Sequence, residues 1–266
     1  MLYINKFNSS GDVVTALDNG TLLKPYLALV NGQLDYNTRH GVLPYEEQYL
    51  TFVFSTSGEV RPMNDYYHSF DDGETWSNGD FNVNAGDVVL FKGDVSQSSS
   101  DAGFWVTGNF SVQGNILSIY DSTGFTSRTT LRSTGDTFSR LFGYPNEPTC
   151  TGLTSAEHLV LPLTALTENC YENMFRGCYS LTTGPEIPDA VLAPACYQDM
   201  FNECQSLNYI KCLSTDSNIG DYTDGWTTGV SGTGTFVKDA NMNDWPINTS
   251  SDYNGIPDGW TVVNAQ

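Results

Sequence analysis

The sequence predicts a mainly β protein with some α. We expect a small N-terminal α+β module, a β-sandwich domain, and a short segment of repeated β/α units with an irregular C-terminal cap. Gly, Ser, Thr, Asn and Asp are abundant and long helical patterns are absent, which favours short strands joined by tight turns. Two stretches also repeat at an offset of 26 residues, which is the signature of stacked supersecondary units that bury their apolar faces against each other.

Residues 1–43 form the predicted α+β module. Leu2–Phe7 alternates like a strand, and a short helix is expected over 13–17. An apolar hairpin is expected over 25–36, because Asn31-Gly32 is a type I′ turn signal between two apolar runs. A piece this small buries little apolar surface, so we expect it to dock onto a partner.

Residues 44–124 carry the regular alternation of strands and turns that is typical of a β-sandwich. The candidate strands are Tyr49–Ser55, Tyr66–Phe70, Asp87–Lys92, Gly103–Val106, Asn109–Val112 and Ile116–Tyr120.

One motif within this domain is a structural Asp box, S-x-D-x-G-x-T-W. It is formed by Ser69, Asp71, Gly73, Thr75 and Trp76. The motif predicts a β-hairpin in which glycine permits the turn, the Ser and Asp side chains bond to turn amides, and the indole packs under the loop. The box occurs once here, which excludes the propellers in which it recurs, and its predicted role is structural.

Residues 125–215 hold the repeats, and 216–266 form the predicted cap. A degenerate first unit precedes the two clear ones, with an insertion around Gly143–Pro148. The predicted repeat core consists of Cys170, Met174, Phe175, Cys178, Leu181, Cys196, Met200, Phe201, Cys204 and Leu207.

The six cysteines are predicted to be packed thiols. Cys170, Met174 and Cys178 fall at i, i+4 and i+8 beside Tyr171 and Phe175, which reads as one apolar face of a short helix. Free cysteine behaves as a small buried hydrophobe. Disulfides and paired metal ligands are the alternatives, but no CxxC occurs, so zinc is disfavoured.

The formal net charge of −20 argues against nucleic-acid and membrane partners, because a negative field repels phosphate backbones and anionic lipids. No run of apolar residues is long enough for a membrane helix. The N-terminus lacks the features of a signal peptide, so we expect synthesis in a cytoplasm without Sec export.

We predict no catalytic residue, cofactor or metal. Histidine occurs only as His40, His68 and His158, without a nucleophile or zinc motif around them. Acidic clusters at Asp71-Asp72, 216–224 and 239–244 lack the spacing of a calcium loop. The 31 acidic residues leave a glycosidase open, since that chemistry needs only two carboxylates.

Aromatic residues in polar, turn-rich surroundings are the candidate glycan contacts, because such rings stack on sugars, and the alternative is that most of them are core or interface anchors. These candidates are Tyr66, Tyr67, Trp105, Trp226 and Trp245.

The run from Leu159 to Ala190, which carries Cys-Tyr-x-x-Met-Phe-x-x-Cys-x-Ser-Leu, resembles the BspA-type leucine-rich repeats of Bacteroidales surface proteins. The segments 207–213, 234–242 and 255–262 are similar to the endings of such proteins. The same combination, with Leu22–Val30 and Leu34–Asn37, resembles fibre or decoration proteins of Bacteroides-infecting, crAss-like phages. The chain departs from the long adhesive solenoids in having few repeats, the first of them interrupted.

The resemblance implies a non-enzymatic virion protein that is assembled in the host cytoplasm, a fibre or decoration subunit on capsid or tail with a host-surface or glycan adhesion role. It implies a homo-oligomer, expected to be a trimer, with residues 1–43 bound to other virion proteins. A bacterial cell-surface adhesin of the BspA type is the first alternative. A carbohydrate-active enzyme is the second.

Overall fold

The computed structural model describes residues 44–94, 103–131, 135–143, 150–243, 245–248 and 253–266, together with five short strands within residues 1–43. The chain divides into two compact units, Met1–Pro44 and Tyr45–Gln266. In the described residues the only helices are short 3-10 turns: η2 (Tyr45–Glu47), η3 (Ile116–Ile119), η4 (Phe125–Ser127) and η5 (Ile219–Asp221). The protein is therefore nearly all β, and the predicted mixture of β and α is wrong.

The described residues within 1–43 all lie in strands. β1 (Tyr3–Ile4), β2 (Ala16–Asp18) and β3 (Thr21–Leu23) form one antiparallel sheet, and β4 (Ala28–Val30) pairs with β5 (Gln33–Asp35). The second pair confirms the predicted hairpin, although its turn residues lie outside the described part of the chain.

The helix predicted over 13–17 is wrong at its described residues, because Ala16 and Leu17 lie in β2 and pair with Leu23 and Leu22. The Asn-Gly that follows β2 reads equally as a helix stop and as a hairpin signal, and the pairing shows that it separates two strands. The α+β character predicted for this module is thereby corrected.

The start of the second unit contains two packed sheets. Strands β13, β6, β11, β8 and β9 are neighbours in one sheet, and β10, β7 and β12 form the other. Phe52 and Phe91 from the first sheet meet Phe104 from the second at ring-centroid distances of 4.8 and 5.0 Å. The bounds of these strands are β6 (Leu50–Phe54), β7 (Gly58–Pro62), β8 (Tyr67–Ser69), β9 (Ser77–Asn78), β10 (Phe81–Val83), β11 (Val88–Lys92), β12 (Phe104–Val106) and β13 (Phe110–Asn115).

The strand predicted at Ile116–Tyr120 is instead the 3-10 helix η3. Its cause is local, because the Asn115 side chain accepts a hydrogen bond from the Leu117 N–H at 2.9 Å and caps the turn.

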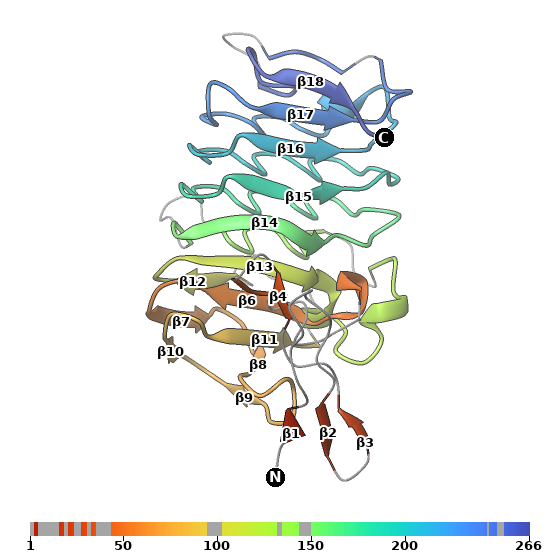
Figure 1. The fold of residues 1–266 in the computed structure, drawn as a ribbon. Helices are drawn as coiled ribbons and strands as arrows, with labels where there is room; N and C mark the ends of the chain where they lie inside the picture. The colour runs from red at the N-terminus through yellow and green to blue at the C-terminus, as the bar shows by residue number, and fades with distance from the viewer. Residues whose placement is uncertain are drawn as a thin grey trace. The chain divides into compact units, whose positions relative to one another are not determined.

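The repeats continue the first of these sheets. β13 pairs in parallel with β14 (Leu153–Val160), and β15 (Thr183–Ile187), β16 (Tyr209–Cys212), β17 (Thr235–Lys238) and β18 (Thr261–Asn264) follow in parallel order (Figure 1). The sheet therefore has ten strands and becomes the face of a β-solenoid-like stack. The predicted boundaries at 124/125 and 215/216 fall inside this one compact unit.

The segments predicted as helical faces are ladders of turns. The N–H groups of Tyr171, Asn173 and Phe175 donate to carbonyls of the following coil at 2.9 Å each. Intervening N–H groups bond within the coil, as Met174 does to the Tyr171 carbonyl at 3.2 Å. These hydrogen bonds run between coils and across four-residue turns, in which an N–H bonds to the carbonyl three residues earlier, whereas an α-helix bonds each N–H to the carbonyl four residues earlier.

Left-handed backbone recurs every fourth residue in these ladders. In one coil Asn169, Asn173 and Gly177 have φ of 53°, 56° and 75°, and in the next coil Asp199 and Glu203 have φ of 52° and 64°. Each such residue ends one turn and begins the next. The residue that follows it, which is Cys170, Met174 or Cys178 in the first coil, is buried, so buried positions recur every fourth residue. That spacing of i, i+4 and i+8 also marks one face of a helix, which is why the pattern predicted a helix.

The core of the stack consists of columns of like side chains. Phe142, Phe175 and Phe201 stack at 5.4 and 5.5 Å, and Trp226 continues the column at 6.0 Å. All ten residues of the predicted repeat core have no exposed surface.

The six cysteines are free and buried, which confirms packed thiols. The thiols of Cys178 and Cys204 donate to aromatic-residue carbonyls of the preceding coil at 3.4 and 3.0 Å. Burial raises the pKa of Cys170 to about 12, so this thiol stays protonated at neutral pH.

Candidate functional site

The predicted glycan contacts separate into buried and surface residues. Tyr66, Trp226 and Trp245 are buried, so the prediction that they contact a glycan is wrong for all three. All three belong to the hydrophobic core. The Trp226 Nε1–H donates to the Gly255 carbonyl at 2.9 Å within that core. Tyr67 is 45% exposed, and Trp105 is partly exposed beneath the Arg61 guanidinium, 4.5 Å from its ring centroid.

The Asp box has the predicted hairpin structure, with β8 and β9 as its strands. Ser69 Oγ donates to Asp71 Oδ1 at 2.7 Å and accepts the Gly73 N–H at 2.9 Å. Asp71 also accepts the N–H and hydroxyl of Thr75 at 2.9 and 2.6 Å. Hydrogen bonds from Thr75 and Ser69 lower the pKa of Asp71 to about 2.

Trp76 is fixed from several sides by this hairpin. Its Nε1–H donates to the Gly73 carbonyl at 2.9 Å, and a Cβ at Gly73 would lie 3.2 Å from the indole ring. The Lys92 ammonium lies 4.1 Å from the indole centroid, and the Tyr49 ring meets it edge-on at 5.2 Å. The Asp box therefore places an aromatic side chain and a cation on one outer face of the sheet.

A pocket of about 280 Å³ lies beside this indole. Tyr67 and Lys92 are direct cross-strand partners, so their side chains project from the same face of the sheet. The pocket is lined by Tyr67, Trp76, Lys92, Gly93, Asp94 and Ser122, and we call it the Tyr67 pocket.

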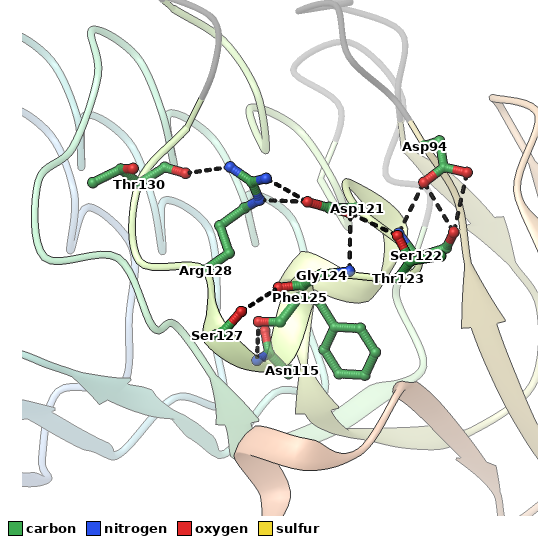
Figure 2. A network of polar contacts seen from close by, with 10 residues as sticks. All are labelled: Asp94, Asn115, Asp121, Ser122, Thr123, Gly124, Phe125, Ser127, Arg128 and Thr130. Carbon is green, nitrogen blue, oxygen red and sulfur yellow. Dashed lines mark hydrogen bonds and ion pairs between the residues drawn. The ribbon is translucent and has the colours of Figure 1, made fainter.

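The polar wall of the Tyr67 pocket is preorganised. One oxygen of Asp94 accepts both the Ser122 N–H and the Ser122 hydroxyl at 2.9 Å, as Figure 2 shows. The neighbouring Asp121 is buried, accepts the Gly124 N–H at 3.0 Å, and accepts the Arg128 Nε–H at 2.7 Å. This network fixes the loop that carries Ser122 and compensates the buried charge of Asp121.

The chemistry of the Tyr67 pocket is that of recognition. An exposed tyrosine ring offers an apolar platform, while an ammonium, a carboxylate and a hydroxyl offer hydrogen bonds of both kinds. A glycosidase of the usual type needs two carboxylates flanking one bond, and Asp94 is the only carboxylate among the residues that line this pocket.

A second pocket, of about 410 Å³, lies at the junction of η2 with β14 and β15. We call it the acidic pocket, because its lining includes Glu46, Glu157, Glu186 and Asp189. Glu186 pairs with Lys211 Nζ at 2.6 Å, and Asp189 accepts the Thr215 N–H at 2.8 Å. The stacked rings of Tyr45 and His158, 4.6 Å apart, form one side of it. All four carboxylates belong to solvent-exposed residues.

The histidines do not join a nucleophile in the described part of the chain. His68 is buried and stacks on Phe81 at 3.9 Å, and burial lowers its pKa. His158 lies in the acidic pocket, and His40 falls outside the described residues. The described residues contain no group of three His, Cys, Asp or Glu side chains that could hold a metal ion. Within the same residues, no helix has both the length and the apolar character needed to cross a membrane.

Sequence reasoning missed most of the Tyr67 pocket. It singled out Tyr67 and Trp76 separately, the first as a glycan contact and the second as a structural residue. Lys92 joins them only through strand pairing, and Asp94 with Ser122 only through a contact across 28 residues of chain. No local pattern in the sequence marks either relationship.

Comparison with protein-family models, curated proteins and solved structures gave no match. The similarity to BspA-type repeats and to phage fibre proteins therefore stays a prediction that depends on the motif residues themselves.

Proposed function

We propose that the protein is a non-enzymatic virion structural protein, a fibre or decoration subunit that contacts host-surface glycans through the Tyr67 pocket. The single observation that supports glycan contact best is the 45% exposure of Tyr67 beside the Lys92 ammonium and the Asp94 carboxylate. A sugar ring would stack on the tyrosine, and its hydroxyls would bond to Lys92 and Asp94. The virion assignment depends on the resemblance of the repeat and N-terminal residues to phage fibre proteins.

The stacked architecture also supports a display role. The aromatic column runs from Phe142 to Trp226 through successive coils, and one core cluster extends from Leu50 in β6 to Trp260 in the second unit. Such a stack buries its apolar surface between neighbours and leaves its outer face free for contacts. In this proposal residues 1–43 bind other virion proteins and the assembled subunit is a homo-oligomer.

Glycan contact is tested by binding of the purified chain to a panel of immobilised surface glycans from the bacterial host. Tyr67→Ala should weaken binding at least tenfold, because it removes the stacking surface. Tyr179→Ala is the matched control, since Tyr179 is 37% exposed on the repeats and lies outside the pocket. Equal binding by the Tyr67→Ala variant and the parent chain would contradict the glycan role.

Virion placement is tested by mass spectrometry of purified particles and by immunogold labelling. The proposal expects the protein on particles, and expects a chain without residues 1–43 to be absent from them. Particles that carry the truncated chain would contradict the docking role. Detection on bacterial surfaces, with none on particles, would favour the BspA-type adhesin instead.

A carbohydrate-active enzyme is the second candidate, and the acidic pocket is the observation that favours it. Carboxylates that act as acid and base usually have pKa values moved apart by burial and by each other. Here Glu46 and Glu157 are exposed to solvent, and Glu186 forms an ion pair with Lys211. We expect no hydrolysis of glycans. A measured hydrolysis that Glu157→Gln abolishes and Glu203→Gln leaves intact would establish the enzyme.

A further inference from the structure

His68 places an ionisable ring inside the sandwich, between its two sheets. It belongs to β8, and its imidazole stacks on Phe81 of β10 with the ring centroids 3.9 Å apart, while Phe70 meets it edge-on at 5.9 Å. Successive side chains of a strand point to opposite faces, so Tyr67 lines the pocket on the outer face while His68 is buried on the inner face. The strand that carries the Tyr67 pocket is therefore fixed to the core through an imidazole.

The groups that face this imidazole are neutral. Its direct cross-strand partners are Phe91 of β11 and Ser77 of β9, and Phe81 covers it from the second sheet. None of these three side chains carries a charge at neutral pH. The buried Nδ1 of His68 has no hydrogen-bond partner in the described part of the chain. The ring is therefore held by packing in its uncharged form.

Charged side chains on the surrounding elements are engaged elsewhere. Lys92 of β11 projects to the outer face, where its ammonium lies 4.1 Å from the Trp76 indole centroid. Glu59 of β7 and Asp80, which precedes β10, lie 2.9 and 3.9 Å from Arg61. The carboxylate of the Asp box accepts hydrogen bonds inside its own hairpin. A proton on the imidazole would therefore place an uncompensated charge in the core, and the attraction of the neighbouring rings for a cation is smaller than that cost.

We propose that His68 is a pH-sensitive latch, and that its protonation opens β8 and β9 from the sandwich. These are the last two strands in the order of the ten-stranded sheet, so their opening disrupts fewer contacts than opening of a central strand. Burial lowers the pKa of His68 below its ordinary value of 6.5, so the closed form is fully favoured above that pH and loses stability as the pH falls below it. Tyr67 and Ser69 adjoin His68, so the Tyr67 pocket and the Asp box take part in the opening.

Hydrogen exchange of the full chain tests the latch, with protection factors measured at pH 7.5 and 5.5. Histidine is the side chain that ordinarily titrates in this range, and the chain contains only His40, His68 and His158. Between these pH values the opening equilibrium should rise by up to about tenfold, so the protection of the β8 amides should fall by that factor. His68→Phe keeps an aromatic ring that takes up no proton, so its protection should be equal at both pH values. His158→Gln is the matched control, because His158 is exposed, and it should behave as the parent chain does.

Three outcomes would overturn the proposal. The first is equal protection of β8 at the two pH values in the parent chain, and the second is a fall that persists in His68→Phe. The third is equal protection of β8 and the central strand β6, which would mean that the whole sheet opens together. Circular dichroism checks the fold of each variant, and His68→Leu takes the place of His68→Phe if the larger ring disturbs the core. No glycan enters these measurements, so a failure of the latch is distinguishable from a failure of glycan binding by the Tyr67 pocket.

Discussion

Replacement of Glu203 by glycine should stabilise the protein, which is the opposite of what a helix predicts. Glu203 has φ of 64°, and its side chain is exposed. Left-handed backbone costs a non-glycine residue about 1–2 kcal/mol. Glycine loses about 0.5–1 kcal/mol more conformational entropy on folding, which reduces the gain. The net expectation is an increase in the free energy of unfolding of about 0.5–1 kcal/mol.

Urea denaturation followed by tryptophan fluorescence measures this change. Glu203→Gly should raise the midpoint and leave the slope unchanged. Gln205→Gly is the matched control, because Gln205 is also exposed but has negative φ, so glycine should lower its midpoint. Gly229→Ala should also lower it, since Gly229 has φ of 74° and an added Cβ would meet Glu203 Cα only at an ordinary 3.5 Å.

The sign of the stability change caused by Glu203→Gly distinguishes a ladder of turns from a helix. A helix interior would lose about 1 kcal/mol on the same glycine substitution. If Glu203→Gly lowered the midpoint as Gln205→Gly does, the ladder of turns would be refuted.

Two further predictions concern titration and thiol chemistry. The carboxylate of Asp71 has a pKa of about 2 in the folded chain, below its unfolded value, so its contribution to stability is present above about pH 4 and is lost as the pH falls toward 2. Stability measured against pH should lose part of this acid dependence in Asp71→Asn, and identical profiles would contradict the assignment. The thiol of Cys170 has its pKa raised to about 12 by burial, and Cys212 likewise, so a thiol reagent at pH 8 should label none of the six until denaturant is added. Rapid labelling of the native chain would show that these columns open.

Most strands were predictable because their signals are local. Side chains alternate between the two faces of the sheet around Phe52 and Phe91, and this two-residue period predicts strands. The apolar runs on either side of Asn31-Gly32 predict the other strand pair. The Asp box fixed its own hairpin, since every hydrogen bond in it joins residues at most four apart.

Secondary structure in the repeats was not predictable from periodicity. Cys170, Met174 and Cys178 are spaced as a helix face would be, and a chain of four-residue turns produces the same spacing. A helix and a chain of turns differ in the hydrogen-bond acceptor of the Tyr171 N–H. In this structure the acceptor is the Cys196 carbonyl, 25 residues away in the next coil. The same limit hid the Tyr67 pocket, whose members come from distant parts of the chain.

The sequence by itself determined which side chains are buried in the repeats, that the cysteines pack as thiols, and that Ser69 to Trp76 form a hairpin. These depend on residue chemistry and on contacts between near neighbours. Only the tertiary structure decided that Trp226 and Trp245 belong to the core while Tyr67 faces solvent, and that the sandwich and the repeats share one sheet. Those outcomes depend on strand pairing between β13 and β14 and on packing outside the two clear repeats, and the 26-residue period carries no signal for either.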